Sequence, residues 1–199
     1  MEKEIKIRNG KIELTGLFEH NSHKKVAVIT HPHPLYGGNM ENPIVEILQE
    51  ELKKNKYSTL RFNFRQVYEP LTDKDSQEDL NIAVNYLKEK GYLDKILICG
   101  YSYGSWISTL VIANGLKCHE TIMISPPVGF LDYTGIKKIS CSGLAVTGIN
   151  DDIAPPELVK ETINNLNPGI KLKTIKGCDH LYSGYTKELR KIISDYLLN

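Results

Sequence analysis

The stretch of sequence that decides the fold reads Lys95-Ile-Leu-Ile-Cys99, followed directly by Gly100-Tyr-Ser-Tyr-Gly104. After Lys95, the four residues Ile96–Cys99 form a short apolar run, which is typical of a strand buried on both faces of a sheet. After Gly104, apolar side chains recur at helical spacing up to about Gly115. The sequence therefore predicts a strand, a sharp turn centred on Ser102, and a helix.

A serine on such a turn has a specific chemical use. The backbone is strained there, and the residues two positions away must be small, as Gly100 and Gly104 are. The turn is expected to expose the hydroxyl of Ser102 and to leave the N–H of Tyr103 facing a developing oxyanion. The alternative is an ordinary strand-to-helix turn with a capping serine. The strand before the serine and the helix after it favour the nucleophile.

The same alternation of strand and helix continues on both sides of this turn. Alternating polarity around Asn9-Gly10 predicts an N-terminal hairpin of Ile5–Arg8 and Lys11–Phe18. Further strands are expected at Val26–Thr30, Ser58–Phe64, Glu120–Ser125, Gly143–Thr147 and Ile170–Ile175. Helices are expected from Asn42-Pro43 to Lys54, from a cap at Ser76-x-x-Asp79 to Gly91, from Pro155-Pro156 to Leu166 and from Tyr185 to Leu198. This order predicts an α/β fold: a doubly wound, mostly parallel sheet that begins with an antiparallel hairpin.

Length and charge set limits on the kind of protein. With 199 residues we expect one domain over residues 1–199, too short for a β/α barrel of about 250 residues. A net charge of +1 argues against nucleic acid as a partner, and no apolar stretch reaches the ~18 residues of a membrane span. The N-terminus has no signal-peptide pattern, and the four cysteines form no C-x-x-C pair. We therefore expect a cytoplasmic protein with reduced thiols, and the oligomeric state stays open.

Two further groups follow later strands of the predicted sheet. Asp151 and Asp152 come after the strand Gly143–Thr147, and His180 comes after Ile170–Ile175. The carboxyl ends of parallel strands share one edge of a sheet, so these side chains should converge on Ser102. The chain order serine, aspartate, histidine is the one expected for a nucleophile, an orienting acid and a general base on this fold.

These residues resemble those of compact, lid-less α/β-hydrolases of the dienelactone-hydrolase kind. The similarity is strongest to small serine hydrolases with a His-Pro-His-Pro segment before a glycine pair, here His31-Pro-His-Pro-Leu-Tyr-Gly37-Gly38. The resemblance covers nearly the whole chain and implies Asp151 as the acid, three residues after Gly148 and four before Pro155. Asp152 is the second choice and is interpreted as a turn residue. The family pattern G-x-x-H places His180 as the base.

The resemblance also implies that the segment after Val26–Thr30 supplies half of an oxyanion hole. The two prolines cannot donate a hydrogen bond from their backbone nitrogens. The donor that complements Tyr103 is therefore expected to be the backbone N–H of His33 or, next in order, of Leu35. This sequence departs from many relatives in Arg65–Pro70, which lacks their glycines. Four tyrosines could either pack under loops or contact substrate, and both roles are equally open for Tyr36, Tyr68, Tyr101 and Tyr103. Cys178 is expected to be an inert thiol.

The predicted activity is serine-dependent hydrolysis of a carboxylic ester, a thioester or a small amide through an acyl-enzyme, without cofactor or metal. The partner expected is a small-molecule acyl substrate. Residues 126–142 leave too little chain for a lid between two strands, so the site should be shallow and open. Two alternatives remain: a non-catalytic binding module on a hydrolase scaffold, and a metal-dependent hydrolase that uses His31 and His33.

Overall fold

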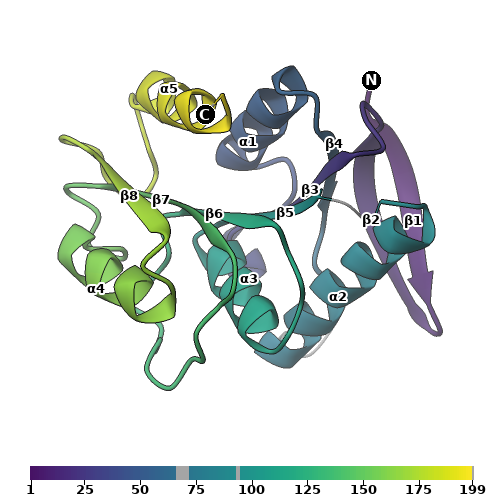
Figure 1. Cartoon of the computed structure of the whole chain (residues 1–199), viewed down its shortest axis with the longest axis horizontal. Coiled ribbons are helices and arrows are strands. Elements are labelled where there is room, and N and C mark those ends of the chain that lie inside the picture. Colours follow the sequence, from purple (N-terminus) through teal and green to yellow (C-terminus); the bar gives the residue numbers. More distant parts are fainter. Residues whose placement is uncertain (66–71, 93–94, 199) are drawn as a thin grey trace.

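The computed structural model describes residues 1–65, 72–92 and 95–198, and within these it forms a mixed sheet in the order β1-β2-β4-β3-β5-β6-β7-β8 (Figure 1). The strands are β1 (Lys3–Asn9), β2 (Ile12–Glu19), β3 (Lys25–Thr30), β4 (Ser58–Phe62), β5 (Lys95–Tyr101), β6 (Glu120–Ile124), β7 (Ser142–Gly148) and β8 (Ile170–Ile175). The β1–β2 hairpin and the β2–β4 pair are antiparallel, and every other pair is parallel. The predicted doubly wound sheet with an N-terminal hairpin is confirmed.

Helices cover both faces of the sheet (Figure 1). One face carries α1 (Pro43–Lys54) and α5 (Thr186–Leu197), and the other carries α2 (Asp73–Glu89), α3 (Tyr103–Ala113) and α4 (Pro156–Leu166). Side chains of β3 alternate between the two apolar cores: Val26 and Val28 join one, and Ala27 and Ile29 join the other. A strand covered in this way needs apolar residues at every position, which explains its unbroken apolar run.

The helix α2 begins earlier than the sequence predicts. Its N-cap is Thr72, whose hydroxyl accepts the N–H of Asp75 while the Asp75 carboxylate accepts the N–H of Thr72. Ser76 lies inside the helix, where its buried hydroxyl accepts a hydrogen bond from Tyr103. Asp79 is also buried and accepts hydrogen bonds from Arg65. The Ser76-x-x-Asp79 pattern is therefore a set of tertiary contacts rather than a cap.

The chain between β6 and β7 carries no lid. Residues 125–141, all of them described, contain no helix or strand. The strand β4 ends at Phe62 rather than Phe64, because the N–H of Phe64 donates to the imidazole of His31 instead of to a neighbouring strand. Most of the predicted unusual loop Arg65–Pro70, including Tyr68, lies outside the described residues.

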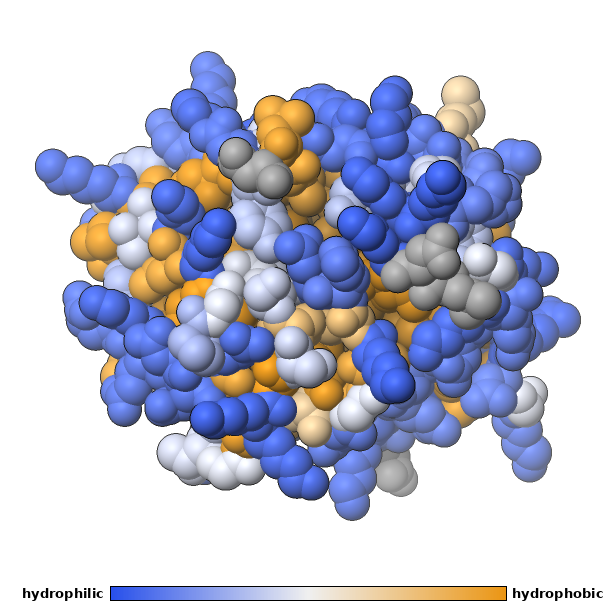
Figure 2. Space-filling view, in the orientation of Figure 1, coloured by the Kyte–Doolittle hydropathy of each residue, from blue (hydrophilic) through white to orange (hydrophobic). Residues whose placement is uncertain are grey.

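Charged and polar residues predominate on the face shown in Figure 2, and apolar side chains appear there only in small patches between them. This matches the mixing of basic and acidic residues along the sequence. Within the described ranges, no helix combines the length and the apolar character needed to cross a membrane.

Candidate active site

Ser102 occupies the strained turn between β5 and α3. Its φ of 51° and ψ of −118° lie outside the regions that a non-glycine residue adopts without strain. A Cβ on Gly100 would lie 2.4 Å from the backbone of Gly104, and one on Gly104 would lie 2.5 Å from the carbonyl oxygen of Thr30. Both positions therefore require glycine, because Gly100 lies against the backbone of the turn itself and Gly104 lies against the end of β3. The packed backbone holds the serine in its unusual conformation.

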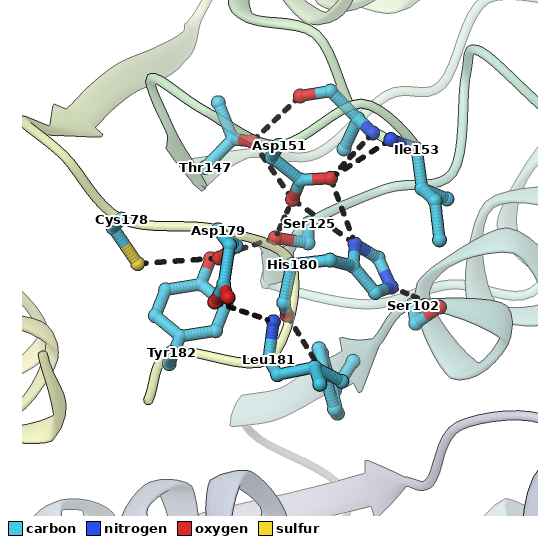
Figure 3. A network of polar contacts seen from close by, with 12 residues as sticks. Ser102, Ser125, Thr147, Asp151, Ile153, Cys178, Asp179, His180, Leu181 and Tyr182 are labelled. Carbon is cyan, nitrogen blue, oxygen red and sulfur yellow. Dashed lines mark hydrogen bonds and ion pairs between the residues drawn. The ribbon is translucent and has the colours of Figure 1, made fainter. Parts of the chain in front are cut away.

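The structure brings Ser102, His180 and Asp151 into one line of hydrogen bonds (Figure 3). His180 Nε2 lies 2.9 Å from Ser102 Oγ, and His180 Nδ1 lies 2.9 Å from Asp151 Oδ1. An ionised carboxylate can only accept, so Nδ1 carries the proton and Nε2 is free to accept the serine hydroxyl proton. Asp152 is exposed, and Asp151 is the carboxylate that reaches the imidazole.

Asp151 is almost completely buried yet well supplied with donors. It accepts hydrogen bonds from the N–H of Ile153 (3.0 Å), the N–H of Ala154 (2.8 Å) and the hydroxyl of Ser125 (2.6 Å). Burial alone would raise the pKa of Asp151, but the hydrogen bonds from His180, Ser125 and Ala154 outweigh it and keep that pKa below its usual range. The carboxylate thus stays ionised beside the imidazole.

Two residues in this network have no role in the sequence-based prediction. Ser125 follows β6 with a φ of 44°, and its hydroxyl lies 2.8 Å from the hydroxyl of Tyr182 (Figure 3). Tyr182 is fully buried and also has a positive φ, of 58°. The position of Ser125 at a predicted strand end places it at the border of the expected site, but that position assigns it no role. No local pattern points to Tyr182, because only the fold of the chain after His180 brings its hydroxyl to that of Ser125.

The tyrosines of the turn are packing residues. The hydroxyl of Tyr101 donates to the carbonyl oxygen of His180 at 2.8 Å, and that of Tyr103 lies 3.0 Å from both Asp73 and Ser76. Both side chains are buried, so they support the turn from within. Tyr36 differs from them because it is 81% exposed and remains accessible to a ligand.

His31 has a structural role in the His-Pro-His-Pro segment. Its Nε2 accepts the N–H of Phe64 at 3.0 Å, so its Nδ1 carries the proton and donates to the carbonyl oxygen of Pro32 at 2.7 Å. Burial lowers the pKa of His31 to about 4, and the ring is neutral at ordinary pH. Both nitrogens are therefore engaged, which leaves no lone pair for a metal. In the described part of the chain, no group of three or more His, Cys, Asp or Glu side chains is arranged to hold one.

The two candidates for the second oxyanion donor differ in their hydrogen bonds. The N–H of Leu35 donates to Nδ1 of His33 at 3.2 Å, as part of the short 3-10 helix η1 (Pro34–Tyr36) that His33 caps. The N–H groups of His33 and Tyr103 donate no hydrogen bond to any residue in the described ranges. The rings of His33 and Tyr103 lie 4.4 Å apart between centroids, so the two segments meet at this edge of the sheet.

The sequence pattern of the dienelactone hydrolase family matches residues 35–192. The chain belongs to this family. The match runs from the segment after β3 to α5 and includes Ser102, Asp151 and His180. Membership of the dienelactone hydrolase family, together with the likeness to serine hydrolases described next, makes the chain a hydrolase.

This dienelactone hydrolase family member resembles one curated protein in sequence and several solved structures in fold. An uncharacterized protein of Rickettsia prowazekii is 33% identical over 186 residues, which are 87% of this chain and 78% of that protein. An α/β serine hydrolase homologue from Coxiella burnetii has a TM-score of 0.87 at 26% identity, covering 97% of this chain and 96% of its own. A lid-less α/β serine hydrolase from Xanthomonas campestris has a TM-score of 0.87 at 21% identity, covering 99% of this chain and 94% of its own.

Cys178 lies two residues before His180, a position that would matter if its thiol were reactive. It is fully buried, and its Sγ lies 3.2 Å from the carbonyl oxygen of Asp179. Burial raises the pKa of Cys178 to about 11, so the thiol stays protonated at neutral pH. In this dienelactone hydrolase family member, the only side chain aligned with the imidazole as a nucleophile among the described residues is the hydroxyl of Ser102.

Proposed function

We propose that the protein is a serine esterase in which Ser102 is the nucleophile, His180 the general base and acid, and Asp151 the group that orients the imidazole. The observation that carries this proposal is the continuous hydrogen-bond line from Ser102 Oγ through His180 to Asp151. A serine hydroxyl is a weak nucleophile until a base accepts its proton, and this geometry supplies that base. The strained turn adds support, because it holds the hydroxyl of Ser102 toward His180.

The reaction then follows from the roles of these groups. His180 Nε2 takes the proton of Ser102 as its oxygen attacks the acyl carbon, and later gives that proton to the leaving alcohol. Asp151 stabilises the imidazolium that forms in between. The N–H of Tyr103 and the N–H of His33 are the proposed oxyanion donors, and that of Leu35 is second to them because it already donates to His33. Water, activated by His180, then hydrolyses the acyl-enzyme.

The surroundings of these groups favour an uncharged, apolar acyl group of modest size. Leu35, Tyr36 and Leu181 are exposed large apolar residues, and they belong to the η1 segment and to the residue after His180. Ile153, whose N–H donates to Asp151, is also exposed. Residues 125–141 offer no lid to enclose a long chain. We therefore propose a short-chain carboxylic ester as the substrate, ahead of a thioester or a small amide.

The test is covalent labelling with a fluorophosphonate probe, which reacts only with an activated serine. We expect one probe per chain on the wild-type protein and none on Ser102→Ala. Hydrolysis of p-nitrophenyl butyrate should fall by about 10⁴-fold or more in the same variant. Ser142→Ala, at an exposed serine at the amino end of β7, is the matched control and should behave as wild type.

Two outcomes would overturn the assignment. Absence of both labelling and hydrolysis in a folded wild-type protein would favour a binding module on a hydrolase scaffold. Activity that survives in Ser102→Ala and disappears with a chelator would favour metal-dependent hydrolysis. Parallel assays with a thioester and an aminoacyl amide determine which bond is cleaved fastest.

A further inference from the structure

Two thiols meet at the amino-terminal edge of the sheet, away from the proposed active site. The Sγ atoms of Cys118 and Cys141 lie 2.8 Å apart, and neither cysteine is in a disulfide. Cys118 lies just before β6 and Cys141 just before β7, and the register of these parallel strands pairs Glu120 with Ser142. No step of the proposed hydrolysis uses either thiol.

The main chain around both cysteines is held in place. The N–H of His119 donates to the carbonyl oxygen of Ile96 at 2.7 Å, which fixes the residue after Cys118. The side-chain amide of Asn167 donates to the carbonyl oxygens of Ile139 (3.0 Å) and Cys141 (3.1 Å). The Sγ–Sγ distance of 2.8 Å exceeds the length of a disulfide bond, about 2.05 Å, by less than about 1 Å. The two thiols can therefore form a bond with little movement of the main chain.

The two thiols also differ in pKa and in access to solvent. The Cys118 thiol donates to Cys141, which raises the pKa of Cys118 and lowers the pKa of Cys141. Cys118 is partly exposed, whereas Cys141 is buried beneath it. A small oxidant thus reaches Cys118 first, and Cys141 lies within reach of the mixed disulfide that Cys118 would form.

We propose that Cys118 and Cys141 form a redox-active pair that closes to a disulfide in the presence of a small-molecule disulfide such as oxidised glutathione. Cys118 loses its proton and attacks one sulfur of the oxidant, and a mixed disulfide forms as the first glutathione leaves as a thiolate that then takes up this proton. Cys141 then attacks the sulfur of Cys118, and the second glutathione leaves with the proton from Cys141. The protein loses two hydrogens and two electrons, and the oxidant becomes two thiols.

Closure would join the amino ends of β6 and β7 and enclose residues 118–141. A bond that closes such a loop restricts the unfolded chain, so we expect Tm to rise by about 10 °C. The residues after the other ends of these strands, Ser125 and Asp151, lie roughly 20 Å or more away along the sheet. We therefore expect kcat/KM to change by no more than about twofold. The thiol pair is independent of the proposed function, because the disulfide can be measured whether or not Ser102 is catalytic.

The experiment uses the full chain, equilibrated in its folded state with oxidised glutathione and then denatured for thiol titration. The four thiols of the reduced protein should fall to two, and peptide mapping should find Cys118 joined to Cys141. Cys118→Ser and Cys141→Ser should each prevent the cross-link and the rise in Tm. Cys99→Ala, at a fully buried cysteine in β5, is the control and should keep both effects.

Three results would overturn the proposal. The first is four free thiols after prolonged equilibration with excess oxidant. The second is glutathione that stays on Cys118 without resolution by Cys141. The third is a disulfide that joins other cysteines or that forms only in urea. Reversal of the Tm shift by dithiothreitol separates the disulfide from unspecific oxidation.

Discussion

Asp151 shows how single hydrogen bonds determine the state of the site. A carboxylate removed from water is costly to ionise, and its pKa rises unless donors surround it. Here two backbone N–H groups, a hydroxyl and an imidazole supply those donors. Ser125 makes the shortest of these contacts and has a positive φ, a strained conformation for a residue other than glycine. Such strain indicates that the hydroxyl group of Ser125 has a specific role.

Removal of this hydroxyl should reduce catalysis without affecting substrate binding. In Ser125→Ala we expect kcat to fall about 10- to 100-fold, since a hydrogen bond to a charged group is worth about 1.5–3 kcal/mol. KM should stay unchanged, because Ser125 acts through Asp151. Ser125→Gly also lacks the hydroxyl but relieves the strained backbone. Recovery of kcat in the glycine variant alone would mean that backbone strain, not the hydroxyl, caused the loss.

His31 links pH to stability because it is buried as a neutral ring. Its pKa is lowered from 6.5 to about 4, so the unfolded chain binds a proton at a higher pH than the folded one. The resulting stabilisation is complete above pH 6.5 and is lost progressively as the pH falls toward about 4. The full difference corresponds to about 3 kcal/mol.

We therefore expect the free energy of unfolding to fall by about 2 kcal/mol between about pH 7 and pH 5 on account of His31. Urea unfolding of wild type and His31→Gln measures this, since the glutamine amide oxygen can still accept the N–H of Phe64. The variant should be less stable at neutral pH and show a smaller loss on acidification. Equal slopes for the two proteins would contradict the role given to His31.

At the scale of elements, the segment between β3 and α1 contains the proposed second donor of the oxyanion hole. His33 caps η1 with a φ of −60° and a ψ of 126°. That φ is the one proline adopts, so His33→Pro removes the N–H while the local backbone is retained. His33→Ala keeps the N–H and removes only the ring.

We expect kcat/KM of His33→Pro to be about 10²–10³-fold below that of His33→Ala, the usual effect of losing one oxyanion donor. Hydrolysis of p-nitrophenyl butyrate by both variants gives the comparison, and circular dichroism verifies that both are folded. Equal activity of the two variants would assign the second donor to another group, with the N–H of Leu35 as the first candidate.

At the scale of the whole molecule, apolar cores lie on both faces of the sheet, and in the described ranges the connection between β6 and β7 places no helix or strand over the edge of the proposed site. Each methylene group that enters a closed pocket gains about 0.8 kcal/mol, whereas one left in solvent gains almost nothing. Residues 125–141 do not enclose the proposed acyl position with a helix or strand. The fold therefore limits the length of the acyl group that the proposed site can bury.

A series of p-nitrophenyl esters tests this limit. We expect KM to fall from acetate to about butyrate and then to level off, because further methylene groups stay in water. Steady-state kinetics below the critical micelle concentration of the longer esters gives the comparison. A KM that continues to fall several-fold with each added pair of methylene groups, up to laurate, would show a buried acyl channel instead.

The sequence by itself determined the order of strands and helices, the turn at Ser102 and the need for Gly100 and Gly104. These features follow from local rules: apolar periodicity, turn chemistry and the small space two residues from a strained serine. The predicted strand ends also indicated His180 and the pair Asp151 and Asp152, and the resemblance to a family favoured Asp151 of the two. The start of α2 was mispredicted because Ser76 and Asp79 have the spacing of a cap but serve distant partners.

Only the tertiary structure decided which distant groups share a hydrogen bond. It brought Ser125 to Asp151 and Tyr182 to Ser125, occupied both nitrogens of His31, used the N–H of Leu35 within its own turn, and set Cys118 against Cys141. Strand register and the path of loops determine these contacts, and both depend on the packing of the whole chain. Local patterns carry no information on which strand ends become neighbours, so such pairs appear only once the sheet is assembled.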